Sequence, residues 1–378
     1  MTDKCVWCFF LRSLPSGGVE RQYIRMANLL SQRRRVVFVC LFAPDPCVQA
    51  TLNESIEFHV LFDKDVGDRS PLFDVLRARR RLKAIIKRKQ VGVVYSGREL
   101  ANLIAALAVG SRPSVRVLWG HRVSHHRFSA RIRMLLPFLR AVQPRVHCQI
   151  ANSRDGLDFY RSLGMCRGRS VYIPNLIDFE HFYFSTERRN KQRTEWGIEN
   201  FECAIGIVGR IAQMKNHAGF IEVAARLFRV RKTVRFFIIG SGDNEVVAEL
   251  GRRADDLGLR GHIEWLPAAN MQTMPNVYCG LDVLCSTSLF GEGFPNVIAE
   301  AMACDCPVVT TDVGEAANIV GSLGTVVPPG DYAAFCKGLL ATVSNLGQRM
   351  GARRRHIRSI SDEEKIIDQI VDLAEQCS

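Results

Sequence analysis

The sequence predicts an α/β protein with two doubly wound, Rossmann-like domains. Short apolar runs alternate with amphipathic stretches along the chain, which is typical of parallel sheets covered by helices on both faces. The length of 378 residues favours two domains of about 150 to 200 residues each. With 47% hydrophobic and 24% charged residues, the composition is globular and excludes disordered and fibrous classes.

Six strands are expected in each half of the chain. In the first half they fall at residues 6–11, 36–42, 56–61, 92–95, 115–119 and 147–151. In the second half they fall at residues 204–208, 234–239, 262–266, 283–286, 308–310 and 325–327. The polar segment 178–201 is the best candidate for the inter-domain connection. We therefore predict domains at residues 1–180 and 181–378, and the last helix is a candidate for packing back on the first domain.

Charge is distributed unevenly between the halves. Residues 1–180 hold 30 Lys and Arg against 14 Asp and Glu, and residues 181–378 hold 21 against 24. The net charges of +16 and −3 favour an anionic partner for the first half, such as a lipid surface, nucleic acid or a phosphorylated acceptor. Apolar runs fall short of the ~20 residues of a spanning helix. We expect a cytoplasmic protein, with peripheral attachment to the inner face of the cytoplasmic membrane as an extension.

The 13 cysteines are expected to be reduced and mostly buried, because many lie in apolar strand-like runs. Cys5 with Cys8 and Cys304 with Cys306 have the close spacing of metal ligands. Neither pair has a second pair or nearby histidines to complete a tetrahedral site. The sequence therefore predicts neither a disulfide scaffold nor a zinc site.

Two cations follow the expected strand at residues 204–208. Arg210 comes after Gly209, and Lys215 opens the next helix. Ligands of open parallel sheets bind beyond the carboxyl ends of the strands. A planar guanidinium and a point-charge ammonium at that edge suit a diphosphate. An arginine after a strand is more often only a solvated residue, so these two cations alone are weak evidence.

The segment 291–300, GEGFPNVIAE, follows the expected strand at 283–286. Pro295 favours a helix start, where the amides near Asn296 make an anion site. Glu292 precedes the helix and Glu300 lies inside it, on the order of 10 Å apart at the helical rise. That separation suits two sugars of one ligand. The alternative is a turn residue and a surface helix residue.

Glycines follow two other expected strands. Gly17 and Gly18 precede an amphipathic helix and allow close approach of a phosphate or sugar, although such a pair also fits a flexible cap. Gly240 and Gly242 resemble part of a dinucleotide fingerprint, but Glu245 stands in place of the third glycine. A nicotinamide enzyme is therefore disfavoured.

As a set, these motifs resemble the retaining glycosyltransferases of family 4, which have the GT-B fold. The resemblance covers most of the chain and is most specific in its second half. The matching residues are Gly17, Gly18 and Glu20; Ile173, Pro174, Asn175, Ile177, Asp178 and Phe182; Gly209, Arg210 and Lys215; the E-x7-E motif from Glu292 to Glu300; and residues 300–314 and 326–331. Departures are Leu176 and Asp305 where glycine is usual, and Asn216 after the lysine.

The resemblance implies roles for these residues. Arg210 and Lys215 would neutralise the diphosphate of a nucleotide sugar, Glu292 would hold hydroxyls of the transferred sugar, and Glu300 would hold the ribose. The implied donor-binding residues are Gly17, Gly18, Arg210, Lys215, Leu266, Glu292, Phe294, Pro295, Asn296, Val297 and Glu300. Fixed cations and a helix end would replace a metal ion, so no metal and no cofactor are expected.

His121, after the strand at 115–119, stands where the family places a histidine that contacts the sugar. It joins Arg210, Lys215 and Glu292 as a catalytic candidate, although a histidine at a strand end is often structural. Arg122, His125 and His126 are neighbouring alternatives. Asp63 and Asp65 have the spacing of a metal-binding DxD motif, but we interpret them as a solvated turn.

The function implied is transfer of a sugar, with retention, from a nucleotide sugar to a glycan or lipid-linked acceptor. UDP is the favoured nucleotide, and surface polysaccharide or lipopolysaccharide synthesis of the bacterial type is the expected context. The alternatives are a nucleotide-sugar epimerase or a phosphorylase of the same fold. A nucleic-acid-binding protein is more remote, because the basic half carries no helix-turn-helix, zinc or RNP signature.

Two basic amphipathic segments, 71–89 and 127–145, have two open interpretations. Their apolar faces either dock on anionic lipid or pack on the sheet and leave the cations in solvent.

Overall fold

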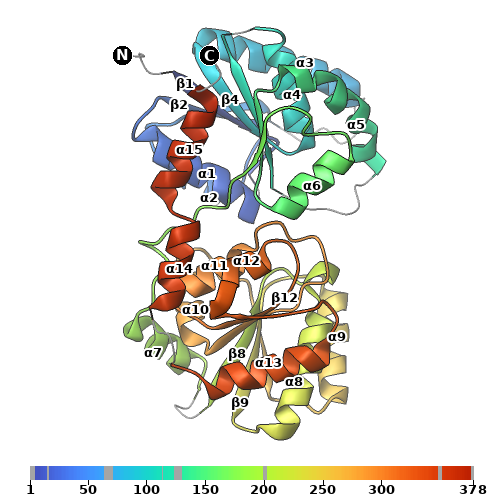
Figure 1. Cartoon of the computed structure of the whole chain (residues 1–378), viewed down its shortest axis with the longest axis vertical. Helices are drawn as coiled ribbons and strands as arrows, with labels where there is room; N and C mark the ends of the chain where they lie inside the picture. Colours follow the sequence, from blue (N-terminus) through green and yellow to red (C-terminus); the bar gives the residue numbers. More distant parts are fainter. Residues whose placement is uncertain are drawn as a thin grey trace. The chain divides into compact units, whose positions relative to one another are not determined.

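The computed structural model describes residues 5–14, 17–63, 71–112, 114–122, 130–198, 202–347 and 351–375. The chain forms two compact units (Figure 1). One comprises Met1–Leu176 with Glu363–Ser378, and the other comprises Ile177–Asp362. The division lies after Leu176 rather than after residue 180, and the last helix belongs to the N-terminal unit.

The N-terminal unit is built on a parallel sheet of seven strands in the order β3-β2-β1-β4-β5-β6-β7. The strands are β1 (Val6–Leu11), β2 (Val36–Phe42), β3 (Glu57–Phe62), β4 (Val91–Gly97), β5 (Arg116–His121), β6 (Cys148–Ala151) and β7 (Ser170–Tyr172). The helices are α1 (Gly18–Ser31), α2 (Pro46–Gln49), α3 (Pro71–Arg88), α4 (Glu99–Val109), α5 (Ala130–Val142), α6 (Arg154–Ser162) and α15 (Glu363–Glu375), with a 3-10 turn at Gln143–Arg145.

Helices cover both faces of this sheet because its strands are apolar on both sides. Phe9 of β1 faces a core that includes residues of α1 and α15. Its neighbours Cys8 and Phe10 face the opposite core, with residues of α3, α4, α5 and α6. This alternation is the period-two pattern of a strand buried on both faces.

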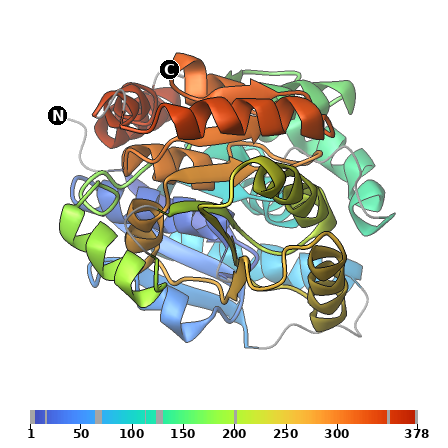
Figure 2. The same cartoon turned by 90° about the horizontal axis from the view of Figure 1, so that it is seen from below.

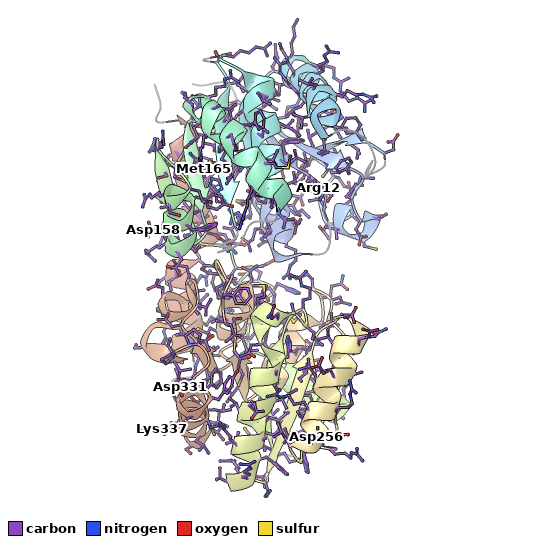
Figure 3. The ribbon with its side chains drawn as sticks, turned by 90° about the vertical axis from the view of Figure 1, so that its right-hand side faces the viewer. Arg12, Asp158, Met165, Asp256, Asp331 and Lys337 are labelled. Carbon is purple, nitrogen blue, oxygen red and sulfur yellow. The ribbon has the colours of Figure 1, made fainter. Side chains whose placement is uncertain are left out.

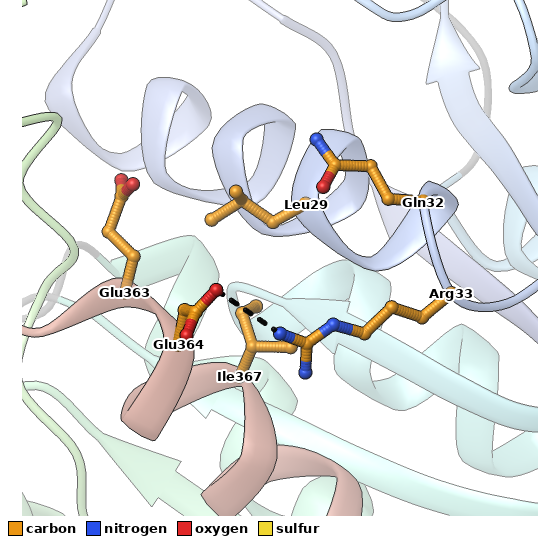
Figure 4. Close-up of a pocket in the computed structure, with 6 residues that line it drawn as sticks. All are labelled: Leu29, Gln32, Arg33, Glu363, Glu364 and Ile367. Atoms are coloured by element: carbon orange, nitrogen blue, oxygen red, sulfur yellow. Dashed lines mark ion pairs between the residues drawn. The ribbon is translucent and has the colours of Figure 1, made fainter. Parts of the chain in front are cut away.

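The C-terminal helix α15 packs against α1 (Figure 4). Leu29 of α1 and Ile367 of α15 lie at this contact, and Arg33 pairs with Glu364 at 3.7 Å and with Asp368 at 2.6 Å. Deeper in the contact, Arg25 donates two hydrogen bonds of 2.7 Å to the carboxylate of Glu363. These contacts fasten the last helix to the N-terminal unit.

The C-terminal unit holds a second parallel sheet, of six strands in the order β10-β9-β8-β11-β12-β13. The strands are β8 (Cys203–Val208), β9 (Val234–Ile239), β10 (Ile263–Leu266), β11 (Val283–Ser286), β12 (Val308–Thr311) and β13 (Thr325–Val327). The helices are α7 (Thr186–Glu195), α8 (His217–Val230), α9 (Asn244–Asp256), α10 (Met274–Gly280), α11 (Asn296–Ala303), α12 (Ala316–Val320), α13 (Tyr332–Ser344) and α14 (Ala352–Ile360), with 3-10 turns at Gln213–Lys215 and Gly321–Leu323.

Helices also cover both faces of this sheet (Figures 1 and 2). Residues of α8, α9 and α13 form one core with the sheet, and residues of α10, α11, α12 and α14 form the other. Asp331, labelled in Figure 3, starts α13 by accepting a hydrogen bond from the amide of Ala334 at 2.9 Å. In the N-terminal unit, Arg12 of the same figure lies over the ring of Phe42, 5.5 Å from its centroid.

The predicted inter-domain connection at 178–201 is wrong in its main part, because α7 packs within the C-terminal unit. Arg189 and Arg193 of α7 both pair with Asp282, at 2.5 and 3.0 Å. Asp282 also accepts a hydrogen bond from the amide of Ala204 at 2.8 Å. Trp196, just after α7, stacks on Phe237 with the ring centroids 4.4 Å apart. Two of the charges that suggested a linker, those of Arg189 and Arg193, form a part-buried ion-pair network instead.

The helix α3 packs its apolar face on the sheet. Val75, Leu82, Ile85 and Ile86 are buried in the core, so they are not available to a lipid surface. The helix α5 differs, because it buries Leu139 but exposes other apolar side chains that are described below. Within the described ranges, no helix is both long and apolar enough to cross a bilayer.

The cysteines that the structure describes are free, as predicted. Cys47 is exposed, Cys5 is half-buried, and the others are buried. Burial raises the pKa of the Cys40 thiol to about 12, so this side chain is neutral at physiological pH.

Candidate active site

The site lies where the strand order of the C-terminal sheet reverses. The strand β8 pairs with β9 on one side and β11 on the other, and the chain proceeds outward in opposite directions from this centre. The helices after β8 and β11 therefore leave on opposite faces of the sheet. Open parallel sheets bind ligands at the carboxyl ends of strands arranged in this way. Arg210 follows β8 and Glu292 follows β11.

Hydrogen bonds to backbone carbonyls connect the loop after β8 with the loop after β11. Thr287, just after β11, donates from Oγ1 to the carbonyls of Lys215 and Asn216 at 3.1 and 3.0 Å. The amide of Leu289 donates to the carbonyl of Met214 at 2.8 Å. The turn that carries Lys215 is thus attached to the loop that carries Glu292.

This attachment brings two predicted residues into direct contact. Nζ of Lys215 lies 2.5 Å from Oε1 of Glu292, and Ser288 Oγ donates to the same oxygen at 2.8 Å. The side chains of the pair are 20% and 10% exposed. Arg210 is exposed, and it has no ion-pair or hydrogen-bond partner among the residues that the structure describes. Its guanidinium is therefore available to a ligand.

Gly314 packs closely against the backbone of the loop that precedes α11. It has φ of +62°, and a Cβ here would lie 2.3 Å from the carbonyl oxygen of Glu292 and 2.5 Å from that of Gly293. The next amide, of Glu315, donates to the Gly293 carbonyl at 2.9 Å. Only glycine permits this approach, so Gly314 holds the backbone at Glu292 in place.

The helix α11 begins at Asn296, directly after Pro295, which precedes the helix rather than lying in its first turn. Phe294 is buried in the core, while Asn296 and Val297 are half-exposed. The first amides of a helix lack acceptors within it and carry its positive dipole end. The start of α11 is therefore a candidate anion-binding end.

Glu300 is not a surface residue of α11. It is 5% exposed, and the hydroxyl of Tyr278, from α10, donates to its Oε2 at 2.8 Å. A buried carboxylate held by a hydrogen bond is suited to accepting hydroxyl hydrogens. The site therefore offers two cations, a helix end and two oriented carboxylates.

Two family models match the chain. The model described as "Glycosyltransferase Family 4" matches residues 16–181, and the model described as "Glycosyl transferases group 1" matches residues 202–345. Together the two models match most of the chain, which is a glycosyltransferase of the family 4 type. It is an enzyme that transfers sugars, as the sequence predicted.

Relatives and solved structures agree with this family. The chain is 24% identical to EpsF of Bacillus subtilis (strain 168) over 306 residues, which are 80% of this chain and 78% of EpsF. It is 31% identical to a D-inositol 3-phosphate glycosyltransferase of Mycolicibacterium smegmatis, over 35% of this chain and 30% of that protein. Anabaena HepE in complex with UDP-glucose has a TM-score of 0.81 at 21% identity, over 98% of this chain and 99% of HepE. The fold is GT-B, with two Rossmann-like units.

The departures of this glycosyltransferase from its family pattern have local explanations. Asn216 has φ of +53°, and its side chain caps α8 by accepting from the amide of Gly219 at 3.0 Å. Asp305 has φ of +61°, the conformation that glycine adopts readily. The amide and carbonyl of Leu176 both bond to the side chain of Gln22, at 2.8 and 2.9 Å.

Leu266, the remaining predicted donor-binding residue, ends the edge strand β10. Its carbonyl accepts a hydrogen bond from the amide of Gly240 at 3.0 Å. A Cβ on Gly240 would lie 1.9 Å from the carbonyl oxygen of Gly209. The glycines after β9 thus allow close backbone packing, which explains the partial dinucleotide fingerprint. A role of Leu266 in donor binding stays a prediction.

Gly17 and Gly18 lie in the N-terminal unit, at the start of α1. Glu20, in the first turn, is 6% exposed and lies 3.5 Å from the guanidinium of Arg98, which follows β4. Burial raises the pKa of the Glu20 carboxyl. The glycines thus precede a buried carboxyl in the first turn of the helix. Their binding of a donor stays a prediction.

His121 is buried in the N-terminal unit, with 3% of its surface exposed. Its Nε2 lies 2.9 Å from Oε1 of Gln149, within hydrogen-bond distance. The centroid of its ring lies 3.9 Å from that of the Tyr160 ring. Burial lowers the pKa of the imidazole. Its neighbour Arg122 is also buried and donates to Asn175 at 2.6 Å. These contacts within the N-terminal unit fit a structural role for His121. Its contact with a sugar stays a prediction.

His125, His126 and Asp65 lie outside the described residues. Asp63 is exposed after β3, as expected of a turn. Over the described ranges, no group of three or more His, Cys, Asp and Glu side chains is arranged to hold a metal ion.

Three residues of the site were not singled out in the sequence: Thr287, Ser288 and Tyr278. Gly314 ends the matched segment 300–314, where it was given no role. Thr287 and Ser288 follow a predicted strand, so the rule that polar residues at strand ends form sites could have found them. Tyr278 carries no such signal, because its helix contacts α11 only in the folded chain.

Proposed function

We propose that this glycosyltransferase moves a sugar from a nucleotide sugar, with UDP as the favoured nucleotide, to a glycan or lipid-linked acceptor. The observation that carries the proposal is the contact of Lys215 with Glu292 at the point where the strand order of the sheet reverses. The exposed Arg210 follows β8, the strand at the centre of this reversal. HepE, of similar fold, has been solved with UDP and with UDP-glucose, which supports this donor class.

In this proposal, Arg210 and Lys215 bind the diphosphate. The guanidinium contributes two parallel hydrogen bonds and the ammonium a point charge. The first amides of α11, at Asn296 and Val297, add the positive end of the helix dipole. The anion is thereby stabilised without a metal ion, so the reaction is proposed to be metal-independent and to need no cofactor.

The two carboxylates bind sugars. Glu292 accepts hydrogen bonds from hydroxyls of the transferred sugar, and Glu300 accepts from the ribose. Retention follows if the acceptor attacks on the face that the nucleotide leaves. The departing phosphate oxygen then accepts the acceptor's proton, so no hydrolase-style pair of carboxylates is required.

Incubation with nucleotide sugars tests the reaction. UDP-, GDP- and ADP-sugars are screened by thermal shift, and the best donor is incubated with candidate acceptors. We expect a new glycoside with the anomeric configuration of the donor, in the presence of EDTA. An epimer or a sugar phosphate would instead identify one of the two alternative reactions.

A Tyr278→Phe variant tests the role of Glu300. Loss of the 2.8 Å hydrogen bond frees the carboxylate to rotate, and we expect UDP to bind about 5- to 10-fold more weakly, as for loss of one hydrogen bond. Isothermal titration measures this. Pyrophosphate lacks the ribose and should bind both proteins equally. Equal weakening of pyrophosphate would contradict the assignment of Glu300 to the ribose.

We further propose that the N-terminal unit binds the acceptor and docks on anionic lipid through α5. Met134 and Phe138, one turn apart, are 72% and 58% exposed, beside the exposed Arg133. The helices α3, α4 and α5 lie on one face of the sheet, and α3 adds exposed cations at Lys83 and Lys87. Exposed apolar side chains on a unit that also exposes cations on the same face suit the interface of an anionic bilayer.

This docking places the enzyme peripherally at the inner face of the cytoplasmic membrane. The acceptor is then a lipid-linked sugar or glycan of surface polysaccharide or lipopolysaccharide synthesis. Nucleic acid is not proposed as a partner.

Liposome flotation at low salt tests the docking. We expect the protein to float with anionic vesicles and not with zwitterionic ones, and a Met134→Ser/Phe138→Ser double variant to float at least about 10-fold less. Val230→Ser, which removes a side chain 68% exposed on the C-terminal unit, is the matched control and should float normally. No preference for anionic lipid would remove the proposal.

A further inference from the structure

The ion pair of Lys215 and Glu292 lies inside the candidate active site and is largely removed from solvent. The two side chains are 20% and 10% exposed, and Nζ lies 2.5 Å from Oε1. Desolvated charges depend strongly on their partners, so separating this pair costs more than separating a surface pair.

The backbone keeps the two side chains close. Thr287 fixes the carbonyl of Lys215, and the close approach of Gly314 to the Glu292 carbonyl restrains the other side. Ser288 donates to the same oxygen of Glu292 that faces the ammonium. The backbone on both sides of the pair is therefore restrained. The Lys215 ammonium moves from Glu292 to a phosphate by rotation of its side chain.

A diphosphate competes with Glu292 for this ammonium. When Nζ turns toward the phosphate, Glu292 loses a charged partner. Its carboxylate, in a residue 8% exposed, then lies near further negative charge. Both effects oppose binding of the anion.

The two ligands of the proposed site differ in the hydrogen-bond donors that they offer to the Glu292 carboxylate. A nucleoside diphosphate brings only negative charge to this position. A nucleotide sugar brings hydroxyl groups, which donate to the carboxylate and replace the hydrogen bond lost from Lys215. The cost of exchange is therefore offset only by the intact donor.

We propose that Glu292 makes the site discriminate between the nucleotide sugar and the nucleoside diphosphate product. When no sugar hydroxyl is present, the Glu292 carboxylate pairs again with the ammonium of Lys215. This inference rests on the proposed function. It assigns Glu292 a second role, in which the carboxylate weakens product binding after transfer and so promotes release.

Titration calorimetry of Glu292→Gln tests the proposal. The probes are UDP and whichever of UDP-glucose, UDP-galactose and UDP-N-acetylglucosamine binds the unaltered protein most tightly. Glutamine keeps the shape but removes the charge. We expect UDP to bind about 10-fold more tightly and the sugar nucleotide no more tightly than before, so that the ratio of the two affinities shifts toward UDP by at least about 10-fold.

A second variant changes the ratio in the opposite direction. Ser288→Ala removes a second donor to Oε1, which makes Glu292 more dependent on Lys215. UDP should then bind more weakly relative to the sugar nucleotide. Glu222→Gln, at an ion pair of 2.7 Å with Arg253 elsewhere in the unit, is the control and should leave both affinities unchanged.

The outcomes separate this inference from the proposed function. If the unaltered protein binds the sugar nucleotide but neither variant changes the ratio, the discrimination role is overturned and the donor site stands. If the unaltered protein binds neither UDP nor any of the three sugar nucleotides, both proposals fall.

Discussion

Arg210→Ala is expected to weaken binding of the nucleotide sugar by about 100-fold. A guanidinium bound to a phosphate through two charge-assisted hydrogen bonds contributes about 3 kcal/mol, and alanine removes both. Because Arg210 is exposed and has no partner among the described residues, the free energy of unfolding without ligand should change by less than about 0.5 kcal/mol. Titration calorimetry and thermal shift measure the two quantities separately.

A matched control separates a specific effect from a loss of general positive charge. Arg229, exposed in the last turn of α8, is replaced by alanine and should leave both quantities unchanged. The donor assignment would be contradicted if Arg210→Ala bound the nucleotide sugar as tightly as the Arg229→Ala control.

Asp282→Asn is expected to destabilise the C-terminal unit by about 3 to 5 kcal/mol. The carboxylate accepts from Arg189, Arg193 and the amide of Ala204, and its side chain is 11% exposed. Asparagine keeps the shape but removes the negative charge that both guanidinium groups face, one of them on a side chain only 8% exposed. Urea unfolding followed by tryptophan fluorescence measures the change.

The control for this variant is Glu222→Gln, whose partner Arg253 is 50% exposed. A solvent-exposed pair should contribute at most about 1 kcal/mol. If Asp282→Asn destabilised the unit no more than this control, the network of α7 would be only an exposed charge cluster, as the linker interpretation assumed.

Strands were predictable where the apolar run was long and uninterrupted. Val6–Leu11, Val36–Phe42 and Val234–Ile239 have the predicted bounds, because strands buried on both faces are apolar at every position. The strand β7, Ser170–Tyr172, was missed. It has one aliphatic residue, Val171, between Ser170 and Tyr172, and so lacks the apolar pair of the equally short β13. The strand is defined by its pairing with β6.

The site was predictable as a set because residues at the ends of parallel strands meet at one edge. That rule grouped Arg210, Lys215 and Glu292 without knowledge of strand order. It could not predict the contact between Lys215 and Glu292, since that depends on β8 and β11 being neighbours. Nor could it predict that Glu300 is buried against Tyr278, because the two residues are 22 positions apart in the sequence.

Charge was the least reliable guide to position. The segment that includes α7 has the polarity of a linker, yet its arginines turn inward to Asp282. Conversely, the basic helix α3 has the pattern of a membrane-surface helix, yet Val75, Leu82, Ile85 and Ile86 pack on the sheet. An amphipathic pattern specifies that a face is buried but not what buries it.

The sequence by itself determined the fold class, the family and the residue types of the site, because periodicity and motif spacing are local properties of the chain. Only the tertiary structure decided which charges meet. It joined Lys215 to Glu292, buried Asp282 between two arginines, and left Arg210 open to a ligand. The physical reason is that the energy of a charge depends on its partners and its exposure, and both are set by strand order and side-chain packing rather than by distance along the chain.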